Sequence, residues 1–250
     1  MKPLQIDMSI FQKFGFERKP VGIKFLLNKP DGIEILDKSL TFCQMFKEAQ
    51  DSKPFYSMKE NFACMGPILL GMRDADPIAL SGQIGASDGI YQEARANRRI
   101  YQHVPRLDKE TVRYVVFSPV DELTYNPDVL VFTANPSQAE ILLRAICYST
   151  GRILSTKTTP AVICSWLFVY PYVSGESNYA ITGLGYGMKA RKVFPEGLIL
   201  ISIPYDLLPI VVQNLQDMEW VLPAYSLAEN EIRDFFKNAS ERIRQEYLKS

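Results

Sequence analysis

Apolar residues recur along the chain with two different spacings, which predicts strands mixed with helices. Strands are predicted where β-branched and aromatic residues form short runs bounded by turn-forming residues. Helices are predicted where apolar residues recur every three or four positions. The predicted strands are 21–27, 79–84, 112–117, 129–133, 179–182 and 198–203. The predicted helices are 8–16, 37–50, 62–72, 89–101, 136–148, 159–170, 205–216 and one that starts near residue 227.

The second half of the chain echoes the first half, cysteines included. The matched pairs are Gly22-Ile23-Lys24-Phe25 with Val129-Leu130-Val131-Phe132, Cys43 with Cys147, and Cys64 with Cys164. Strands and helices at close spacing predict an α+β fold. We therefore expect two pseudo-duplicated lobes, 1–125 and 126–225, packed as one body, with a C-terminal amphipathic helix at 226–250. A single domain is the alternative.

Composition and charge narrow the range of partners. The 250 residues are 47% hydrophobic and 22% charged, as in ordinary soluble proteins. The 28 Lys and Arg residues balance 28 Asp and Glu residues, so no net charge attracts nucleic acid. The longest apolar run, 161–173, is too short to span a membrane, and the N-terminus lacks a signal-peptide pattern. We expect a cytoplasmic protein whose partner is a small molecule, with homo-oligomer formation through the C-terminal helix left open.

Several short motifs carry a resemblance to a known family. They are Phe42-Cys43, Ala49, Glu60, Cys64, Gly66, Leu70-Gly71, the stretch 126–132, Asn135-Pro136, 161–164 and 183–191. From about Lys19 to Met218, the chain resembles the domain-of-unknown-function family 169. It departs from the family pattern at Met65-Gly66-Pro67. The family is bacterial and archaeal and has no established activity, so the resemblance implies a common fold and marks cysteine and glycine positions without naming a reaction.

The cysteines are the first candidate for chemistry. Thiolates bind soft metals and act as nucleophiles, so Cys43, Cys64 and Cys164 could ligate a metal ion or an iron–sulfur cluster. The chain has no C-x-x-C motif to support that hypothesis. In a thiol-dependent enzyme, Cys64 would be the nucleophile, with His103 or Glu60 as its base. Cysteine is also among the most buried residue types, and plain core packing is the simpler explanation of these positions.

A glycine-rich loop is the second candidate. Gly183, Gly185 and Gly187 are followed by Lys189 and Arg191. Glycines let backbone N–H groups turn toward an anion, and the cations add charge. These five residues are our predicted ligand- or cofactor-binding residues, although the spacing is neither a Walker loop nor a dinucleotide fingerprint. A tight turn after strand 179–182 is the competing interpretation.

Two further clusters have simpler explanations. Arg95, Arg98 and Arg99 lie near His103, the single histidine, and could hold an anion or form a solvated helix face. Aromatic residues at 166, 168, 170 and 172 fit either a ligand pocket or a helical core.

The favoured function is binding of a small anionic ligand or cofactor between the two lobes. The alternatives are a cysteine-ligated metal or redox protein, a thiol-dependent enzyme and an interaction module. The sequence identifies neither the cofactor nor a reaction.

Overall fold

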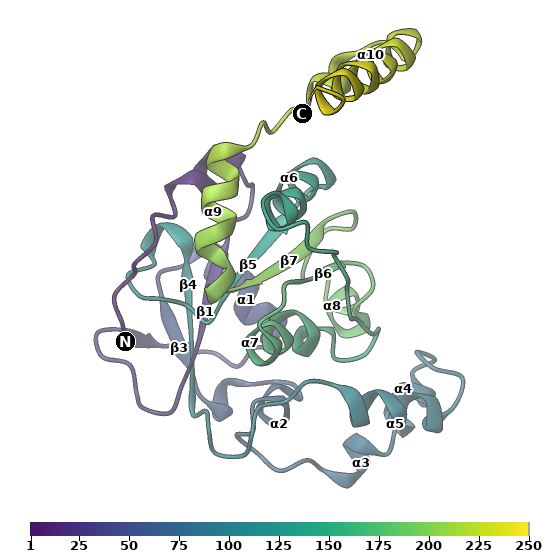
Figure 1. The fold of residues 1–250 in the computed structure, drawn as a ribbon. Helices are drawn as coiled ribbons and strands as arrows, with labels where there is room; N and C mark the ends of the chain where they lie inside the picture. The colour runs from purple at the N-terminus through teal and green to yellow at the C-terminus, as the bar shows by residue number, and fades with distance from the viewer. Residues whose placement is uncertain (250) are drawn as a thin grey trace. The chain divides into compact units, whose positions relative to one another are not determined.

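The structure is a computed structural model that describes residues 1–249. It has two compact units, residues 1–216 and residues from 217 onward, and each is described by itself. The first unit mixes helices with one seven-stranded sheet, so the fold is α+β as predicted (Figure 1). The sheet order is β2-β3-β4-β1-β5-β7-β6. The strands are β1 (Val21–Leu26), β2 (Glu34–Ile35), β3 (Phe55–Ser57), β4 (Tyr114–Pro119), β5 (Val129–Ala134), β6 (Asn178–Ile181) and β7 (Ile199–Pro204).

The pairing is antiparallel throughout the sheet except between β2 and β3. The first strand lies in the middle, between β4 and β5, and every residue of β5 is buried. A strand that is buried on both faces reads as a continuous apolar run, which is why Val129–Ala134 is easily predicted from the sequence.

Helices cover both faces of the sheet. Adjacent residues of a strand point to opposite faces, so Phe132 and Thr133 mark the two sides of β5. The ring of Phe132 packs 4.9 Å from Phe11, in the 3₁₀ helix η1 (Ser9–Phe14). Thr133 accepts a hydrogen bond from Gln50 of α1 (Phe42–Asp51) on the other side.

Helix α6 (Pro136–Cys147) shares the face of η1, because its Gln138 side chain donates to the Phe14 carbonyl. It also contacts α9 (Leu208–Asp217), where Asn214 donates to the Ala145 carbonyl. Figure 1 shows α6 and α9 on the near side of the sheet and α1 on the far side. Asn135 caps α6 as its sequence pattern predicts, accepting from the Gln138 N–H at 2.9 Å.

The short helices between the strands differ most from prediction. The predicted helix 62–72 is reduced to one turn, α2 (Gly66–Leu69). The predicted strand 79–84 is wrong, since this stretch contains α3 (Pro77–Leu80) and the start of α4 (Gln83–Ser87). The predicted helix 89–101 starts later in the structure, as α5 (Ala94–His103).

Gly82 explains the break inside the mispredicted strand. Its backbone is left-handed, at φ +85°, and a Cβ there would lie 2.0 Å from the Ala94 carbonyl oxygen. The chain therefore turns sharply between α3 and α4, where the Gly82 backbone packs against the start of α5, and the short apolar stretch on either side cannot continue as a strand.

The predicted helix 159–170 is shifted toward the C-terminus, since it starts later than predicted and continues beyond residue 170 as η4 (Ser165–Val169, a π-helix) followed by α7 (Tyr170–Ser174). Helical geometry places Phe168 in the core, against Phe42 and Phe46 of α1. The remaining helices of the first unit are η2 (Lys59–Asn61), η3 (Val120–Glu122), α8 (Tyr186–Ala190) and η5 (Tyr205–Leu207).

The proposed internal duplication stays a prediction. The central strands β1 and β5 are neighbours, and each has its own half's later strand, β4 or β7, on its outer side. The helices that follow them, α1 and α6, lie on opposite faces of the sheet. Cys43 of α1 and Cys147 of α6 are therefore not in equivalent places.

The second unit contains η6 (Pro223–Ser226) and the 19-residue helix α10 (Glu229–Tyr247). The apolar residues Phe235, Phe236, Ile243 and Tyr247 of this helix are exposed. Within residues 1–249, no helix is long and apolar enough to cross a membrane.

Candidate functional site

A cavity of about 250 Å³ lies in the first unit, on the α1 side of the sheet. Its wall carries three of the four cysteines, Cys43, Cys64 and Cys164, together with Gly187 and Arg191. Sequence segments from both sides of residue 125 therefore meet at this cavity. Most of the lining is apolar, and its other polar residues are Thr41, Asp88, Asn97, Tyr101 and Tyr186.

Cys64 is held at the N-terminus of α1 by short backbone bridges. The Leu40 N–H donates to Asn61, and the Ala63 N–H donates back to the Leu40 carbonyl at 2.9 Å. These bonds place the Cys64 sulfur 3.4 Å from two backbone nitrogens, those of Phe42 and Gly66, which both donate to it. A helix N-terminus presents unpaired N–H groups and a partial positive charge, so negative charge on a sulfur is favourable there.

The other two cavity cysteines are in less polar surroundings. Burial raises the pKa of the Cys43 thiol, whereas the hydrogen bond with Thr41 and the charge of Arg191 act in the opposite direction. Burial also raises the pKa of the Cys164 thiol, and the nearby Cys64 and Cys43 sulfurs add to that rise. Both thiols are therefore protonated near neutral pH.

The glycine-rich loop contributes to the cavity through its end only. Gly187 and Arg191 line the cavity, whereas Gly183, Gly185 and Lys189 do not. Lys189 instead pairs with Glu196 at 2.8 Å.

Three N–H groups of this loop donate within the protein. The Leu184 N–H donates to the Ile181 carbonyl, the Tyr186 N–H to Pro160 and the Lys189 N–H to Gly185. The positive charge that this segment brings to the cavity is that of the Arg191 guanidinium. Arg191 donates one bond to the Gly187 carbonyl at 2.9 Å and has no carboxylate at ion-pair distance among residues 1–249.

Two further polar residues of the cavity, Asn97 and Tyr101, were not predicted from the sequence; they lie one turn apart on α5. Asn97 is fully buried; its Nδ2 donates to the Gly82 carbonyl at 3.1 Å, and in the described part of the chain its Oδ1 has no hydrogen-bond partner. Burial raises the pKa of the Tyr101 hydroxyl. The available signal was that both residues lie on the side of α5 opposite its arginines.

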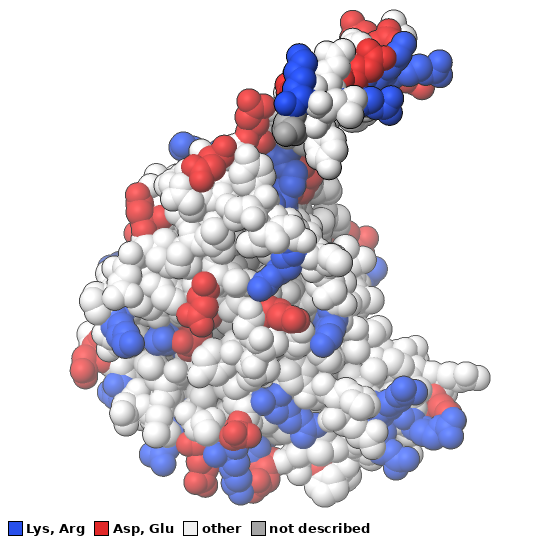
Figure 2. Space-filling model, in the orientation of Figure 1, with Lys and Arg blue, Asp and Glu red and all other residues white. Residues whose placement is uncertain are grey.

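His103 and the arginines of α5 lie away from the cavity. Arg95, Arg98, Arg99 and His103 line a separate surface depression and are exposed. Figure 2 shows Lys and Arg gathered over the part of the surface that Figure 1 assigns to α4 and α5. Glu60 lines a different depression near Glu110. Neither predicted base, His103 or Glu60, therefore lines the cavity that holds Cys64.

The metal-site hypothesis gains no geometric support. The three predicted ligands, Cys43, Cys64 and Cys164, share the cavity, yet residues 1–249 contain no group of three His, Cys, Asp or Glu side chains placed to hold a metal ion. The fourth cysteine, Cys147, ends α6 on the other face of the sheet.

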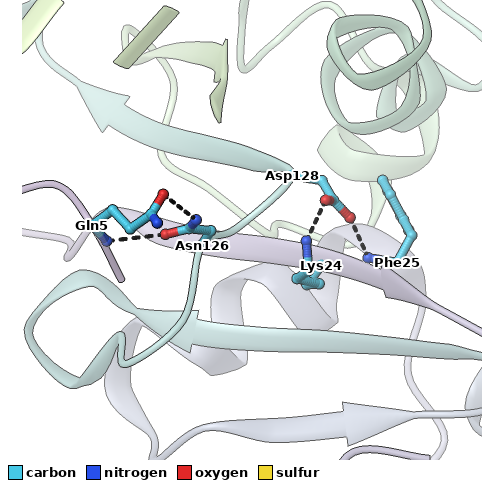
Figure 3. Close-up of polar contacts among 5 residues, drawn as sticks. All are labelled: Gln5, Lys24, Phe25, Asn126 and Asp128. Atoms are coloured by element: carbon cyan, nitrogen blue, oxygen red, sulfur yellow. Dashed lines mark hydrogen bonds and ion pairs between the residues drawn. The ribbon is translucent and has the colours of Figure 1, made fainter. Parts of the chain in front are cut away.

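A second polar cluster lies between β1 and the start of β5 (Figure 3). One oxygen of Asp128 is 2.5 Å from the Lys24 ammonium, and the other accepts the Phe25 N–H at 2.7 Å. Asn126 is tied to Gln5 by two hydrogen bonds. Burial raises the pKa of the Asp128 carboxyl, and Lys24 acts in the opposite direction. Both carboxylate oxygens of Asp128, and the side-chain oxygen and nitrogen of Asn126, have protein partners (Figure 3). This cluster therefore holds neighbouring parts of the fold together.

Comparison with known proteins places the chain in a family. An uncharacterized protein, MJ0308, of Methanocaldococcus jannaschii is 25% identical over 209 residues, which cover 80% of this chain and 88% of the relative. No solved structure matches the chain. A family model, DUF169, with the description "Uncharacterised ArCR", matches residues 9–214, which include the whole sheet and every residue of the cavity. The chain therefore belongs to the domain-of-unknown-function family 169.

Proposed function

We propose that the protein binds a small organic ligand with an anionic end in the cavity between α1, α5 and the segment 160–191. The observation that carries this proposal is that two polar groups of one mainly apolar cavity lack partners within residues 1–249: an arginine without a carboxylate and a buried amide oxygen without a donor. A ligand would satisfy both groups and fill the apolar space between them.

The size and lining of the cavity restrict the ligand. About 250 Å³ is slightly below the roughly 300–1,000 Å³ of pockets for drug-sized molecules, which favours a smaller ligand. Arg191 would hold a carboxylate or a phosphate through its guanidinium.

Asn97 adds a second requirement. Because its free atom is an acceptor, the ligand would offer an O–H or N–H group there. Asp88, at the same cavity, also favours a donor on that side. The expected ligand is therefore bifunctional, with an anion at one end and a hydrogen-bond donor elsewhere.

A homologous series tests the proposal. The straight-chain carboxylates from acetate to octanoate would be compared by thermal unfolding and by calorimetric titration. Each methylene that enters the cavity adds about 0.8 kcal/mol, so the dissociation constant should fall roughly fourfold per carbon until the cavity is full. The matching primary alcohols test the need for the anion.

The controls use two neighbouring cations. Arg191→Met should abolish the preference for the carboxylate over the alcohol, and Lys192→Met, an exposed residue outside the cavity lining, should keep it. The ω-hydroxy carboxylates should bind more tightly than the plain ones, and Asn97→Leu should remove that gain. Equal, length-independent effects of all carboxylates would reject the proposal.

A further inference from the structure

We propose that Cys64 is a nucleophilic thiol that forms a covalent bond with an electrophilic ligand in this cavity. This inference rests on the proposed function, because it takes the same cavity and the same anion-binding Arg191 as its setting. It adds the class of ligand, a small anionic molecule with an electrophilic carbon.

The first argument is the setting of the sulfur. Cys64 is partly exposed and lines the cavity, so a ligand there can reach it. The N–H groups of Phe42 and Gly66 donate to its sulfur, each at 3.4 Å. The Phe42 N–H belongs to the first turn of α1, a ten-residue helix whose N-terminus favours negative charge on the attacking atom.

The structure maintains this setting through local contacts. Thr41 caps α1 and forms a capping box with Gln44, which fixes the first turn of the helix. Gly66 has no room for a side chain, because a Cβ there would lie 2.5 Å from the Phe62 ring. Its backbone can therefore approach the Cys64 sulfur where a larger residue would force the loop away.

The second argument comes from the opposite wall. The buried Asn97 Oδ1 lacks a donor in the described residues, and Asn97 lines the same cavity as Cys64. A buried unpaired acceptor is costly in an empty site and is satisfied when a ligand supplies an O–H or N–H group. The cavity is therefore equipped to hold a molecule beside the sulfur.

Cys64 differs from the other cavity thiols. Cys43 and Cys164 are protonated near neutral pH because burial raises the pKa of each. Backbone N–H groups also lie close to these two sulfurs, those of Cys43 itself, Cys164 itself and Ser165, but burial outweighs their effect on the pKa. The two hydrogen bonds from Phe42 and Gly66 therefore single out Cys64 as the attacking atom.

The covalent step balances without a further reactant. The Cys64 thiol gives its proton to solvent, and a sulfur lone pair forms the S–C bond. The bond from that carbon to its leaving group breaks, and the leaving group departs with the electron pair. Arg191, at the same cavity, would hold the anionic end of the ligand during the attack.

Two reagents of nearly equal size test this inference on the folded, full-length protein. Iodoacetamide is neutral and iodoacetate is an anion, and mass spectrometry of the digested protein follows the reaction of each cysteine. With iodoacetamide at pH 7.5, Cys64 should react roughly tenfold faster than Cys147, which ends α6 outside the cavity. The ratio of the iodoacetate rate to the iodoacetamide rate should be higher at Cys64 than at Cys147.

The variants separate this inference from the proposed function. Arg191→Met should lower the rate ratio at Cys64 to that of Cys147, and Lys192→Met should leave it unchanged. A Cys64 that reacts no faster than Cys147, or more slowly than Cys43, overturns the inference even if carboxylates bind. Fast reaction at Cys64 with a rate ratio that Arg191→Met does not alter supports a reactive thiol and rejects the anion site.

Discussion

The cavity around Cys64 and the cluster around Asp128 both contain polar side chains within one α+β unit. They differ in whether those side chains have hydrogen-bond or ion-pair partners. Both carboxylate oxygens of Asp128 have protein partners, the Lys24 ammonium and the Phe25 N–H. At the cavity, the Asn97 Oδ1 has no partner within residues 1–249, and Arg191 has no carboxylate. Satisfied groups next to filled space indicate a structural role, and unsatisfied groups next to open space indicate a place for a ligand.

A buried pair of charges does not by itself identify a functional site in this protein. A buried aspartate–lysine pair with a raised aspartate pKa has the usual marks of a catalytic site. In this protein the pair links β1 to the start of β5, and none of its atoms lines the cavity. Function is better indicated here by Asn97, whose unpaired amide oxygen belongs to a residue of the cavity wall, than by the paired charge of Asp128.

The largest expected effect is on the structural cluster. Asp128→Ala removes the partner of the Lys24 ammonium and of the Phe25 N–H. The side chains of Lys24 and Asp128 are each less than one-fifth exposed, so water replaces the lost contacts poorly. The free energy of unfolding should fall by about 3 kcal/mol in urea denaturation. Asp121→Ala breaks an exposed pair with Lys19 and should cost under about 1 kcal/mol. Equal losses of unfolding free energy in the two variants would mean that the Asp128–Lys24 pair stabilises the fold no more than an exposed ion pair does.

A smaller effect separates two glycines of the predicted ligand loop. A Cβ at Gly185 would lie 2.5 Å from the Ile163 side chain, on the cavity wall, whereas a Cβ at Gly183 meets nothing within 4 Å. Gly185→Ala should therefore cost about 1–3 kcal/mol of unfolding free energy. Gly183→Ala should change it by less than about 0.5 kcal/mol. A similar cost at both positions would show that the loop needs backbone freedom rather than close packing.

Arg191 should behave unlike Asp128. Arg191 is exposed, so Arg191→Met should change the unfolding free energy by less than about 0.5 kcal/mol. The same variant should lose the stabilisation that carboxylates give to the wild-type protein. Loss of stability without any change in ligand response would place Arg191 with the structural residues and contradict its assigned role.

The smallest effect is on pH dependence. The pKa values of the Cys43 and Cys164 thiols are raised in the folded state, so above about pH 8.5 the unfolded chain releases thiol protons first. The folded state then binds more protons, and the unfolding free energy falls as pH rises. Urea denaturation at pH 7.5 and pH 9.5 should show a smaller fall in the double variant Cys43→Ala, Cys164→Ala. An equal fall would show that these thiols do not contribute.

Local sequence signals predict the parts of the fold that local forces determine. Asn135-Pro136 starts α6 as expected, and the apolar run of β5 forms a central strand. Strand 79–84 was wrong because a short apolar stretch fits helix and strand equally well, and the close approach of Gly82 to the Ala94 carbonyl decides between them. That contact is invisible without the fold.

The candidate site is predictable in its residue types and unpredictable in its arrangement. Cys43, Cys64, Cys164 and Arg191 were all candidates, and they line one cavity because α1 and the segment 160–191 lie on the same face of the sheet. His103 was a candidate because histidine titrates near pH 7, but it faces solvent outside the cavity. Asn97 carries no sequence signal strong enough to select it, since its importance comes from burial without a partner.

A protection experiment asks whether the bound anion and the Cys64 thiol occupy the same cavity. The rate of Cys64 alkylation by iodoacetamide would be measured with increasing octanoate, with Cys147 as the internal reference. If they share the cavity, octanoate should slow the alkylation of Cys64 at the concentrations that raise the unfolding temperature, and should leave the rate at Cys147 unchanged. A raised unfolding temperature with an unchanged Cys64 rate would place the bound anion outside this cavity and contradict the proposed function.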